Sequence, residues 1–480
     1  MPVSPARQAA FQILLRVDQQ NAYASELLHS EHLAPLSPAD RGLCTELVMG
    51  CLRWRQRLDH LIGDTASQPL GKLDPEVLAA LRLGAYQLRF LTRVPPNAAV
   101  NESVELVKRA RKKSAASFVN AVLHKLARQA DDSQRAKGGV PSHGEAGSVV
   151  SAGTEAVFTP ADAAAGNSPS ALAAAWSHPE WLVARWVEQF GSERTSLICQ
   201  FDQQTPTTTL RFPSNPEQAE ALERELQAEG VTLGPGRLLR SARVVRAGDV
   251  THTRVWREGR IAIQDEGSQL VAALVGTDPR AGLRILDCCA APGGKTAAIA
   301  ESNPQATILA VELHPHRADL LRRRLAGSSG GGIEVLAADA TRLPHGRDFD
   351  RILADVPCSG TGTLARHPEI KWKLRPEDLP GLRQAQTAIL AAALGHLAPG
   401  GVLVYSTCSL EPEENASVVE EALRGNPLAR LLDCAAQLGA LKAAGELTWP
   451  DIESLCAGPY LQTLPGVHPC DGFFATMIRL

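Results

Sequence analysis

Two cysteines stand at the ends of apolar runs in the C-terminal half of the chain. Cys408 ends the run "GVLVYSTC" (401–408), and Cys358 follows "FDRILADVP" (349–357). Both runs have the composition of buried strands, and parallel α/β sheets bind their ligands beside the carboxyl ends of neighbouring strands. A single buried cysteine is more often inert packing than a reactive group. Two thiols at one rim indicate nucleophilic chemistry.

The residues before Cys358 narrow the reaction. Methyltransferases that act on exocyclic amines commonly carry a D/N-P-P-aromatic sequence after the fourth strand, whereas this chain has "DVPC" (355–358). A thiol at this place suits a carbon acceptor such as cytosine C5, because a thiolate that adds to C6 makes C5 nucleophilic. Asp355 is the candidate contact for N3 of the base. Neither spacing nor chemistry decides whether Cys358 or Cys408 attacks.

A glycine-rich turn, "DCCAAPGGKT" (287–296), follows the first strand of the same region. Such a turn aims a helix N-terminus at a ligand. A P-loop needs glycine where Cys289 stands, and GxGxxG is absent, so neither a triphosphate nor a dinucleotide is expected. The plainer alternative is a tight turn without a ligand. Glu312 and Asp339 end the next two strands and suit a ribose diol and an adenine amino group, so we predict S-adenosylmethionine as the cofactor.

The elements that must position these residues alternate between strand and helix. Strands are predicted at 283–289, 306–313, 333–339, 349–357 and 401–408, with helices at 294–302, 315–326, 379–397 and 413–424. This alternation predicts a doubly wound parallel sheet within a domain of residues 271–480. The closing "DGFFATMIRL" (471–480) predicts one further strand.

The preceding residues predict three other segments. Residues 1–130 show helical periodicity over 6–18, 40–63, 75–91 and 98–111 and predict a compact bundle. In 131–170, 25 of the 40 residues are Ala, Gly, Ser, Thr or Pro, which predicts a flexible linker or insertion. Residues 171–270 predict a small α+β domain that begins with a helix capped by Ser177.

Composition adds weaker signals. The net charge is −3, but residues 1–130 hold 17 Lys and Arg against 11 Asp and Glu. The basic runs at 51–57 and 107–114 suggest a nucleic-acid partner. The ten cysteines lack zinc-ligand spacing, and no run of 18 apolar residues occurs. We therefore expect no metal, no membrane segment and a cytoplasmic protein with free thiols.

Four motifs together resemble one family. "DCCAAPGGKT", "DVPCSGTGT", "HPEIKW" and "YSTCSLEPEEN" are similar to the motifs of RNA cytosine-C5 methyltransferases of the NOL1/NOP2/Sun group. The N-terminal helices, including "VPPNAAVNESVELVKRA", resemble the RNA-binding NusB-like domain attached to some members. The resemblance implies an all-α NusB-like bundle, a small α+β domain and an α/β Rossmann-like class I methyltransferase domain.

The same resemblance implies roles for individual residues. Cys408 would be the nucleophile, Cys358 would assist proton removal and release of the base, and Asp355 would contact both the cytosine and the cofactor. The cofactor-binding positions would be Cys289, Ala290, Ala291, Pro292, Gly293, Gly294, Lys295, Glu312, Asp339 and Asp355. The implied target is cytosine 967 of 16S ribosomal RNA, naked or in an early small-subunit intermediate, and the protein is expected to be a monomer.

Two stretches and two rival functions stay open. Related members usually show an Asn and "RVN" where this chain has Asp202 and "RFP" (211–213). The "KWK" at 371–373 suits either RNA contact or packing of its tryptophan onto the core. The rival functions are a non-catalytic rRNA-binding or assembly factor and a DNA cytosine methyltransferase, in which Cys358 would attack.

Overall fold

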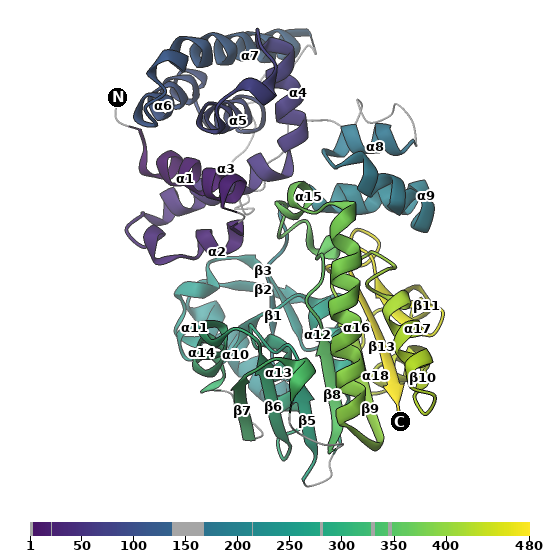
Figure 1. Cartoon of the computed structure of the whole chain (residues 1–480). Coiled ribbons are helices and arrows are strands. Elements are labelled where there is room, and N and C mark those ends of the chain that lie inside the picture. The colour runs from purple at the N-terminus through teal and green to yellow at the C-terminus, as the bar shows by residue number, and fades with distance from the viewer. Residues whose placement is uncertain are drawn as a thin grey trace. The chain divides into compact units, whose positions relative to one another are not determined.

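The computed structural model describes residues 3–20, 22–136, 168–213, 215–278, 282–327, 332–343 and 348–480 (Figure 1). The chain packs as two units: Met1–Thr205 with Leu364–Lys373, and Pro206–Thr363 with Leu374–Leu480. Nearly all of the predicted linker lies outside the described residues. The predicted domain bounds stay a prediction, because one packed unit can contain more than one domain.

The first unit is built from helices, as the sequence predicts. Proline stands in the first turn of several of them, where its missing N–H costs no hydrogen bond. Leu47, Leu58, Leu81 and Leu123 are fully buried in one continuous core. The helices are α1 (Pro5–Gln19), α2 (Ala24–Leu28), α3 (Pro38–Arg53), α4 (Arg55–Thr65), α5 (Pro75–Phe90), α6 (Pro96–Arg109), α7 (Ala116–Ala136), α8 (Pro169–Trp176), α9 (Glu180–Asp202) and α15 (Ile370–Lys373).

The single helix predicted over 40–63 is wrong, because the chain bends at Trp54 (φ −100°, ψ 17°) between α3 and α4. A helix start leaves its first N–H groups without partners inside the helix. Ser177 Oγ accepts hydrogen bonds from two of them, Gln56 N–H at 3.1 Å and Arg57 N–H at 3.3 Å. Ser177 therefore caps α4 and is not the N-cap of α9.

Residues 364–373 pack within the helical unit. Lys371 is 1 % exposed, and its Nζ donates to the carbonyl oxygen of Arg53 at 3.0 Å. The Nε1 of Trp372 donates to the carbonyl oxygen of Leu52 at 2.6 Å. These carbonyls end α3, where no intrahelical donor remains and a cation is favoured. Trp372 therefore packs within the helical unit, as one of the two interpretations expects, and Lys371 is buried beside it.

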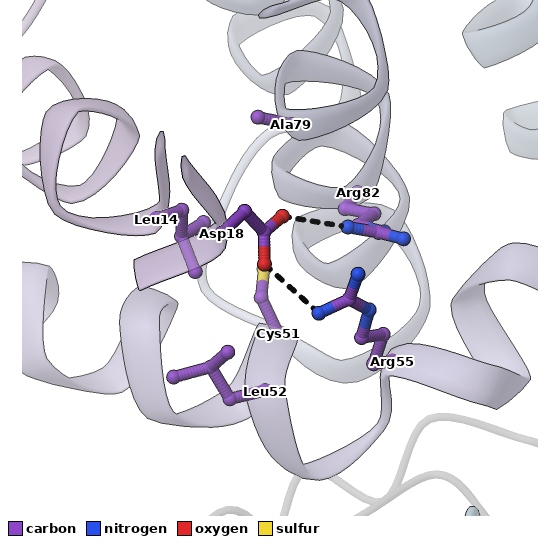
Figure 2. A pocket seen from close by; sticks show the side chains of 7 residues that line it. All are labelled: Leu14, Asp18, Cys51, Leu52, Arg55, Ala79 and Arg82. Carbon is purple, nitrogen blue, oxygen red and sulfur yellow. Dashed lines mark hydrogen bonds and ion pairs between the residues drawn. The ribbon is translucent and has the colours of Figure 1, made fainter. Parts of the chain in front are cut away.

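A small cavity among α1, α3, α4 and α5 has about 10 Å³ of free space, room for about one water molecule. Asp18 lies between two guanidinium groups there, at 2.9 Å from Arg55 and 3.1 Å from Arg82 (Figure 2). Arg82 also pairs with Asp59 at 2.7 Å. These ion pairs join neighbouring helices and leave no space for a cofactor.

A small antiparallel sheet opens the second unit, in the order β2-β3-β1-β4. Leu222 and Leu226 of its helix α10 pack with Leu210 and Val231. This arrangement confirms the predicted α+β architecture. The elements are β1 (Thr209–Arg211), α10 (Pro216–Ala228), β2 (Thr232–Pro235), β3 (Ala242–Ala247), α11 (Arg254–Arg257), β4 (Ala262–Ile263) and α12 (Glu266–Leu274).

A larger sheet fills the rest of the second unit, in the order β11-β12-β13-β9-β8-β5-β6-β7. Strands β5 to β9 run parallel, as predicted, but β13 pairs antiparallel with β9, and β10, β11 and β12 continue the antiparallel part. The sheet is therefore mixed. Its strands are β5 (Arg284–Asp287), β6 (Thr307–Glu312), β7 (Gly332–Ala337), β8 (Phe349–Asp355), β9 (Leu397–Thr407), β10 (Arg430–Leu432), β11 (Cys456–Ala457), β12 (Tyr460–Thr463) and β13 (Phe473–Arg479).

Alternate residues of the strands enter separate cores on the two faces of this sheet. Val402 and Val404 of β9 join one core, to which α12, α13 and α18 contribute, whereas Leu403 and Tyr405 join the other with α16 and α17. Figure 1 shows α16 running along β8 and β9. The helices are α13 (Gly294–Ser302), α14 (Pro315–Leu325), α16 (Leu379–His396), α17 (Ala416–Gly425) and α18 (Cys434–Ala443).

Candidate active site

The strand order reverses between β5 and β8, because β5 is followed by β6 on one side and neighbours β8 on the other. Ligands of such sheets bind beside this switch point at the carboxyl ends of the strands. The glycine-rich turn, Asp355 and both candidate thiols stand at these ends. The fold therefore brings most of the predicted site residues to one edge.

The glycine-rich turn leads from β5 into α13 through Gly293, whose φ of 105° is unfavourable for other residues. A Cβ at this position would meet Leu321 Cδ1 at 2.7 Å. The backbone conformation thus favours glycine, and a larger residue would force the Leu321 side chain of α14 to shift. The free N–H groups of α13 begin directly after it, at Gly294.

Asp287, at the end of β5, is a site residue that the sequence reasoning missed. It is 1 % exposed, and its Oδ2 accepts a hydrogen bond from Thr296 Oγ1 at 2.7 Å. Its Oδ1 has no partner among the described residues. Burial raises the pKa of Asp287 to about 6. Its place as the last residue of the first strand was the signal that could have identified it.

Lys295 connects the turn to the end of β8. Its Nζ donates to Asp355 Oδ2 at 2.7 Å, and Ser406 Oγ of β9 donates to Asp355 Oδ1, also at 2.7 Å. Burial opposes the charge on Lys295, but the adjacent Asp355 more than offsets it, so the pKa of Lys295 lies above its ordinary value.

The two candidate thiols are in contact. Cys358 Sγ and Cys408 Sγ lie 3.3 Å apart, and both are free and half-buried. The contact follows from the sheet, because Asp355 of β8 is in register with Ser406 of β9. The hydrogen bond with Cys408, together with burial, raises the pKa of Cys358 well above its ordinary value. The contact and the burial therefore disfavour the thiolate form of Cys358.

The two acids at the ends of the next strands accept hydrogen bonds from residues that follow them in the sequence. Glu312 is 5 % exposed and accepts the N–H of His314 at 3.0 Å. Asp339 is half-buried, and its Oδ1 accepts hydrogen bonds from the N–H and the Oγ1 of Thr341 at 2.9 and 2.7 Å. These bonds hold the pKa of Asp339 below its ordinary value. The predicted contacts of Glu312 with the ribose and of Asp339 with the adenine stay predictions.

Three family models match successive parts of the chain. Residues 4–128 match the NusB family, residues 178–251 the ferredoxin-like domain of RsmF/B-like methyltransferases, and residues 275–479 the 16S rRNA methyltransferase RsmB/F. A probable ribosomal RNA small subunit methyltransferase B of Bacillus subtilis is 33% identical over 100% of this chain and 99% of its own length. The chain belongs to the RsmB family.

Two further proteins agree with membership of the RsmB family. The ribosomal RNA small subunit methyltransferase B of Pseudomonas putida is 32% identical over 92% of this chain and 93% of its own. The crystal structure of a methyltransferase homologue protein from Pyrococcus horikoshii is 26% identical and covers 66% of this chain and 100% of its own, with a TM-score of 0.53. The three predicted domain folds are confirmed, in the predicted order along the chain: a NusB-like bundle, a small α+β domain and a Rossmann-like domain.

Asp202 and the "RFP" segment, where this chain differs from the usual RsmB-family pattern, make contacts within the protein. Asp202 is fully buried, and its Oδ2 lies 3.1 Å from His178 Nε2. Arg211 pairs with Glu301, and its Nε donates to Gln264 at 3.1 Å. Neither Asp202 nor Arg211 is therefore an open RNA contact.

The described part of this RsmB-family chain has no helix that is both long and apolar enough to cross a membrane. The same residues hold no group of three or more His, Cys, Asp or Glu side chains that could bind a metal ion. All ten cysteines are free thiols, including the pair at the strand ends.

Proposed function

We propose that this protein transfers a methyl group from S-adenosylmethionine to C5 of a cytosine in 16S rRNA, through a covalent bond between Cys408 and C6 of the base. The contact of 3.3 Å between Cys408 and Cys358, beside the Lys295–Asp355 ion pair, carries the proposal. Membership of a family of rRNA methyltransferases supports the substrate class. By resemblance, the target is cytosine 967.

The strand ends fit this cofactor. A buried carboxylate oxygen without a partner, such as Asp287 Oδ1, is expected to take a donor from a ligand. The turn from Cys289 to Lys295, with Glu312 and Asp339, would hold the cofactor. When bound, S-adenosylmethionine supplies the methyl group as an electrophile.

Attack on the base falls to Cys408. Its thiolate forms the S–C6 bond, and the electron pair of the C5–C6 double bond shifts to make C5 nucleophilic. Asp355 holds the Lys295 ammonium at the same rim, and a cation there would favour the thiolate form of an attacking cysteine. Asp355 is at the same rim to contact N3, where charge develops. C5 then accepts the methyl group.

Release falls to Cys358. Loss of the C5 proton to solvent returns its electron pair to the C5–C6 bond, and the S–C6 bond breaks to expel the Cys408 thiolate. The neutral thiol of Cys358 lies at hydrogen-bond distance from that sulfur. It can therefore stabilise the departing thiolate and assist the elimination.

The partner that we propose is 16S rRNA, naked or in an early assembly intermediate, bound by a monomer in the cytoplasm. The match of residues 4–128 to the NusB family and the free state of the ten thiols support this setting.

The test is transfer of tritiated methyl groups into undermethylated small-subunit rRNA. Cys408→Ala should abolish incorporation, whereas Cys358→Ala should accumulate a covalent RNA–protein adduct. Cys456→Ala, at a half-buried thiol in β11, is the matched control and should retain activity. Full turnover by Cys408→Ala would refute the assignment of the nucleophile.

The rival functions give different results in the same system. Binding of RNA without any incorporation by the native protein would favour an assembly factor. Covalent trapping by 5-fluorocytosine in DNA but not in RNA, with Cys358 as the attached residue, would favour a DNA methyltransferase.

A further inference from the structure

Glu414 stands in the loop between β9 and α17 and has no role in the reaction described above. Its side chain is fully buried. A buried carboxylate is costly unless hydrogen bonds satisfy it. The contacts described for this one are hydrogen bonds from neutral donors, and most of them come from residues directly beside the two thiols.

The carboxylate joins the two cysteine loops. Its Oε1 accepts the backbone N–H of Ser359 at 2.8 Å, and its Oε2 accepts the hydroxyl groups of both Ser359 and Ser409. Ser359 directly follows Cys358, and Ser409 directly follows Cys408. One side chain thus holds the residue after each thiol.

Two further contacts fix the carboxylate itself. Gln386 Nε2 of α16 donates to Glu414 Oε1 at 2.8 Å and also to the carbonyl oxygen of Pro357 at 2.9 Å. The hydroxyl of Tyr405 donates to the backbone carbonyl of Glu414 at 2.6 Å. Glu414 and its hydrogen bonds to Ser359 and Ser409, which we call the clamp, are therefore held by a helix and a strand of the sheet and not by loop residues alone.

We propose that Glu414 is a positioning residue that keeps the Cys358 and Cys408 sulfur atoms in contact, and that release of the methylated base depends on this contact. The role in release rests on the proposed function, whereas the role in holding the thiols does not. A loop displacement of about 1 Å is enough to remove such a contact and to cost a large factor in rate.

The contact can be measured without RNA or cofactor by oxidising the folded protein with diamide. Diamide takes two electrons and two protons from the two thiols, and an S–S bond forms between them. The Cys358–Cys408 peptide is then quantified by mass spectrometry, which separates it from any product of Cys288 and Cys289. Disulfide formation requires close sulfur atoms in a narrow geometry.

Glu414→Ala should slow this capture by about tenfold or more, because both serines lose their shared acceptor. Glu414→Gln should restore it to within about twofold, since an amide oxygen can accept from the Ser359 N–H while the amide NH₂ donates to the two hydroxyls. Glu420→Ala, at an exposed glutamate of α17, should match the native rate. If Glu414 served stability alone, Glu414→Ala would lower the melting temperature but would not slow disulfide capture.

In the methylation assay, Glu414→Ala should lower kcat and lengthen the lifetime of the RNA adduct while KM for RNA changes little. If Glu414→Ala fails to fold, Ser409→Ala removes only the Cys408 side of the clamp and should also slow capture. Capture at the native rate by a folded Glu414→Ala, or by Ser409→Ala in its place, would overturn the proposal. Absence of methyl transfer by the native protein would instead contradict the proposed function and leave the diamide result interpretable.

Discussion

The ion pair between Lys295 and Asp355 joins the glycine-rich turn to the thiol-bearing edge of the sheet. Its two partners come from α13 and β8, so a single contact of 2.7 Å couples two elements that the chain separates by 60 residues. The "GGKT" sequence around Lys295 looks like part of a P-loop, but here the ammonium group of Lys295 is paired with the carboxylate of Asp355.

Lys295→Met should reduce methyl transfer by about 100-fold in single-turnover experiments, because it removes a preorganised cation from the place where a thiolate forms. The variant keeps a side chain of similar length, so the turn should retain its conformation. Lys442→Met, at an exposed lysine of α18, is the matched control. Equal rates for the native protein and Lys295→Met would remove the lysine from the mechanism.

Asp287 makes stability in the absence of cofactor depend on pH. Its pKa is about 6 in the folded protein, whereas an aspartate in an unfolded chain has a pKa of about 3.8. Between these values the folded protein keeps a proton that the unfolded chain has released, so the free energy of unfolding falls as the pH rises. The penalty is fully present above about pH 6 and is about 3 kcal/mol.

Asp287→Asn should therefore gain stability relative to the native protein as the pH rises from 4 to 7. The measurement is the difference in the free energy of unfolding of the cofactor-free proteins across this range, with Asp319→Asn on the surface of α14 as the control for loss of an exposed carboxylate. A difference for Asp287→Asn that is constant with pH would contradict burial as the cause.

At the scale of elements, the break between α3 and α4 shows how distant residues decide a local structure. The first turn of α4 is capped by Ser177, and the last carbonyls of α3 receive Lys371 and Trp372. Each partner lies more than 100 positions away in the sequence. Periodicity over 40–63 therefore predicted one helix, since it records which face is apolar and not where the ends find hydrogen bonds.

The parallel strands were predictable for the opposite reason. Each of β5, β6, β8 and β9 is an apolar run bounded by a turn, and their order places Asp355, Cys358 and Cys408 at one edge. The antiparallel part was not predictable, because β11 and β12 are short and their pairing depends on β13. Asp287 and Glu414 were missed since a single acid in a sequence does not reveal burial.

Trp372→Phe should destabilise the helical unit although the residue lies within the sequence range predicted for the methyltransferase domain. The change leaves the carbonyl of Leu52 without the indole donor and should cost about 1–3 kcal/mol. Hydrogen exchange of the amides of α3 and α4 measures it. Trp449→Phe, which loses an indole hydrogen bond to Ser454 in the other unit, should leave this exchange unchanged. Equal exchange in Trp372→Phe and the native protein would show that the hydrogen bond does not stabilise α3.

At the scale of the whole molecule, the basic excess of residues 1–130 divides into two kinds of side chain. In the run at 51–57, Arg53 is buried and Arg55 pairs with Asp18, so this run does not form a solvated basic face. In the run at 107–114, Arg111 and Lys113 are exposed. The two runs look alike in the sequence because letters do not record burial.

Arg111→Gln with Lys113→Gln should weaken RNA binding, if the helical unit holds RNA through this run. Two lost phosphate contacts should lower the slope of log affinity against log salt by about 1.5, because each contact releases part of a counterion. Binding to an rRNA fragment over a range of salt concentrations gives the slope. Lys72→Gln with Arg93→Gln removes the same charge from exposed positions outside the run and should change the slope less. Equal slopes for the two double variants would mean that overall charge, and not this run, attracts the RNA.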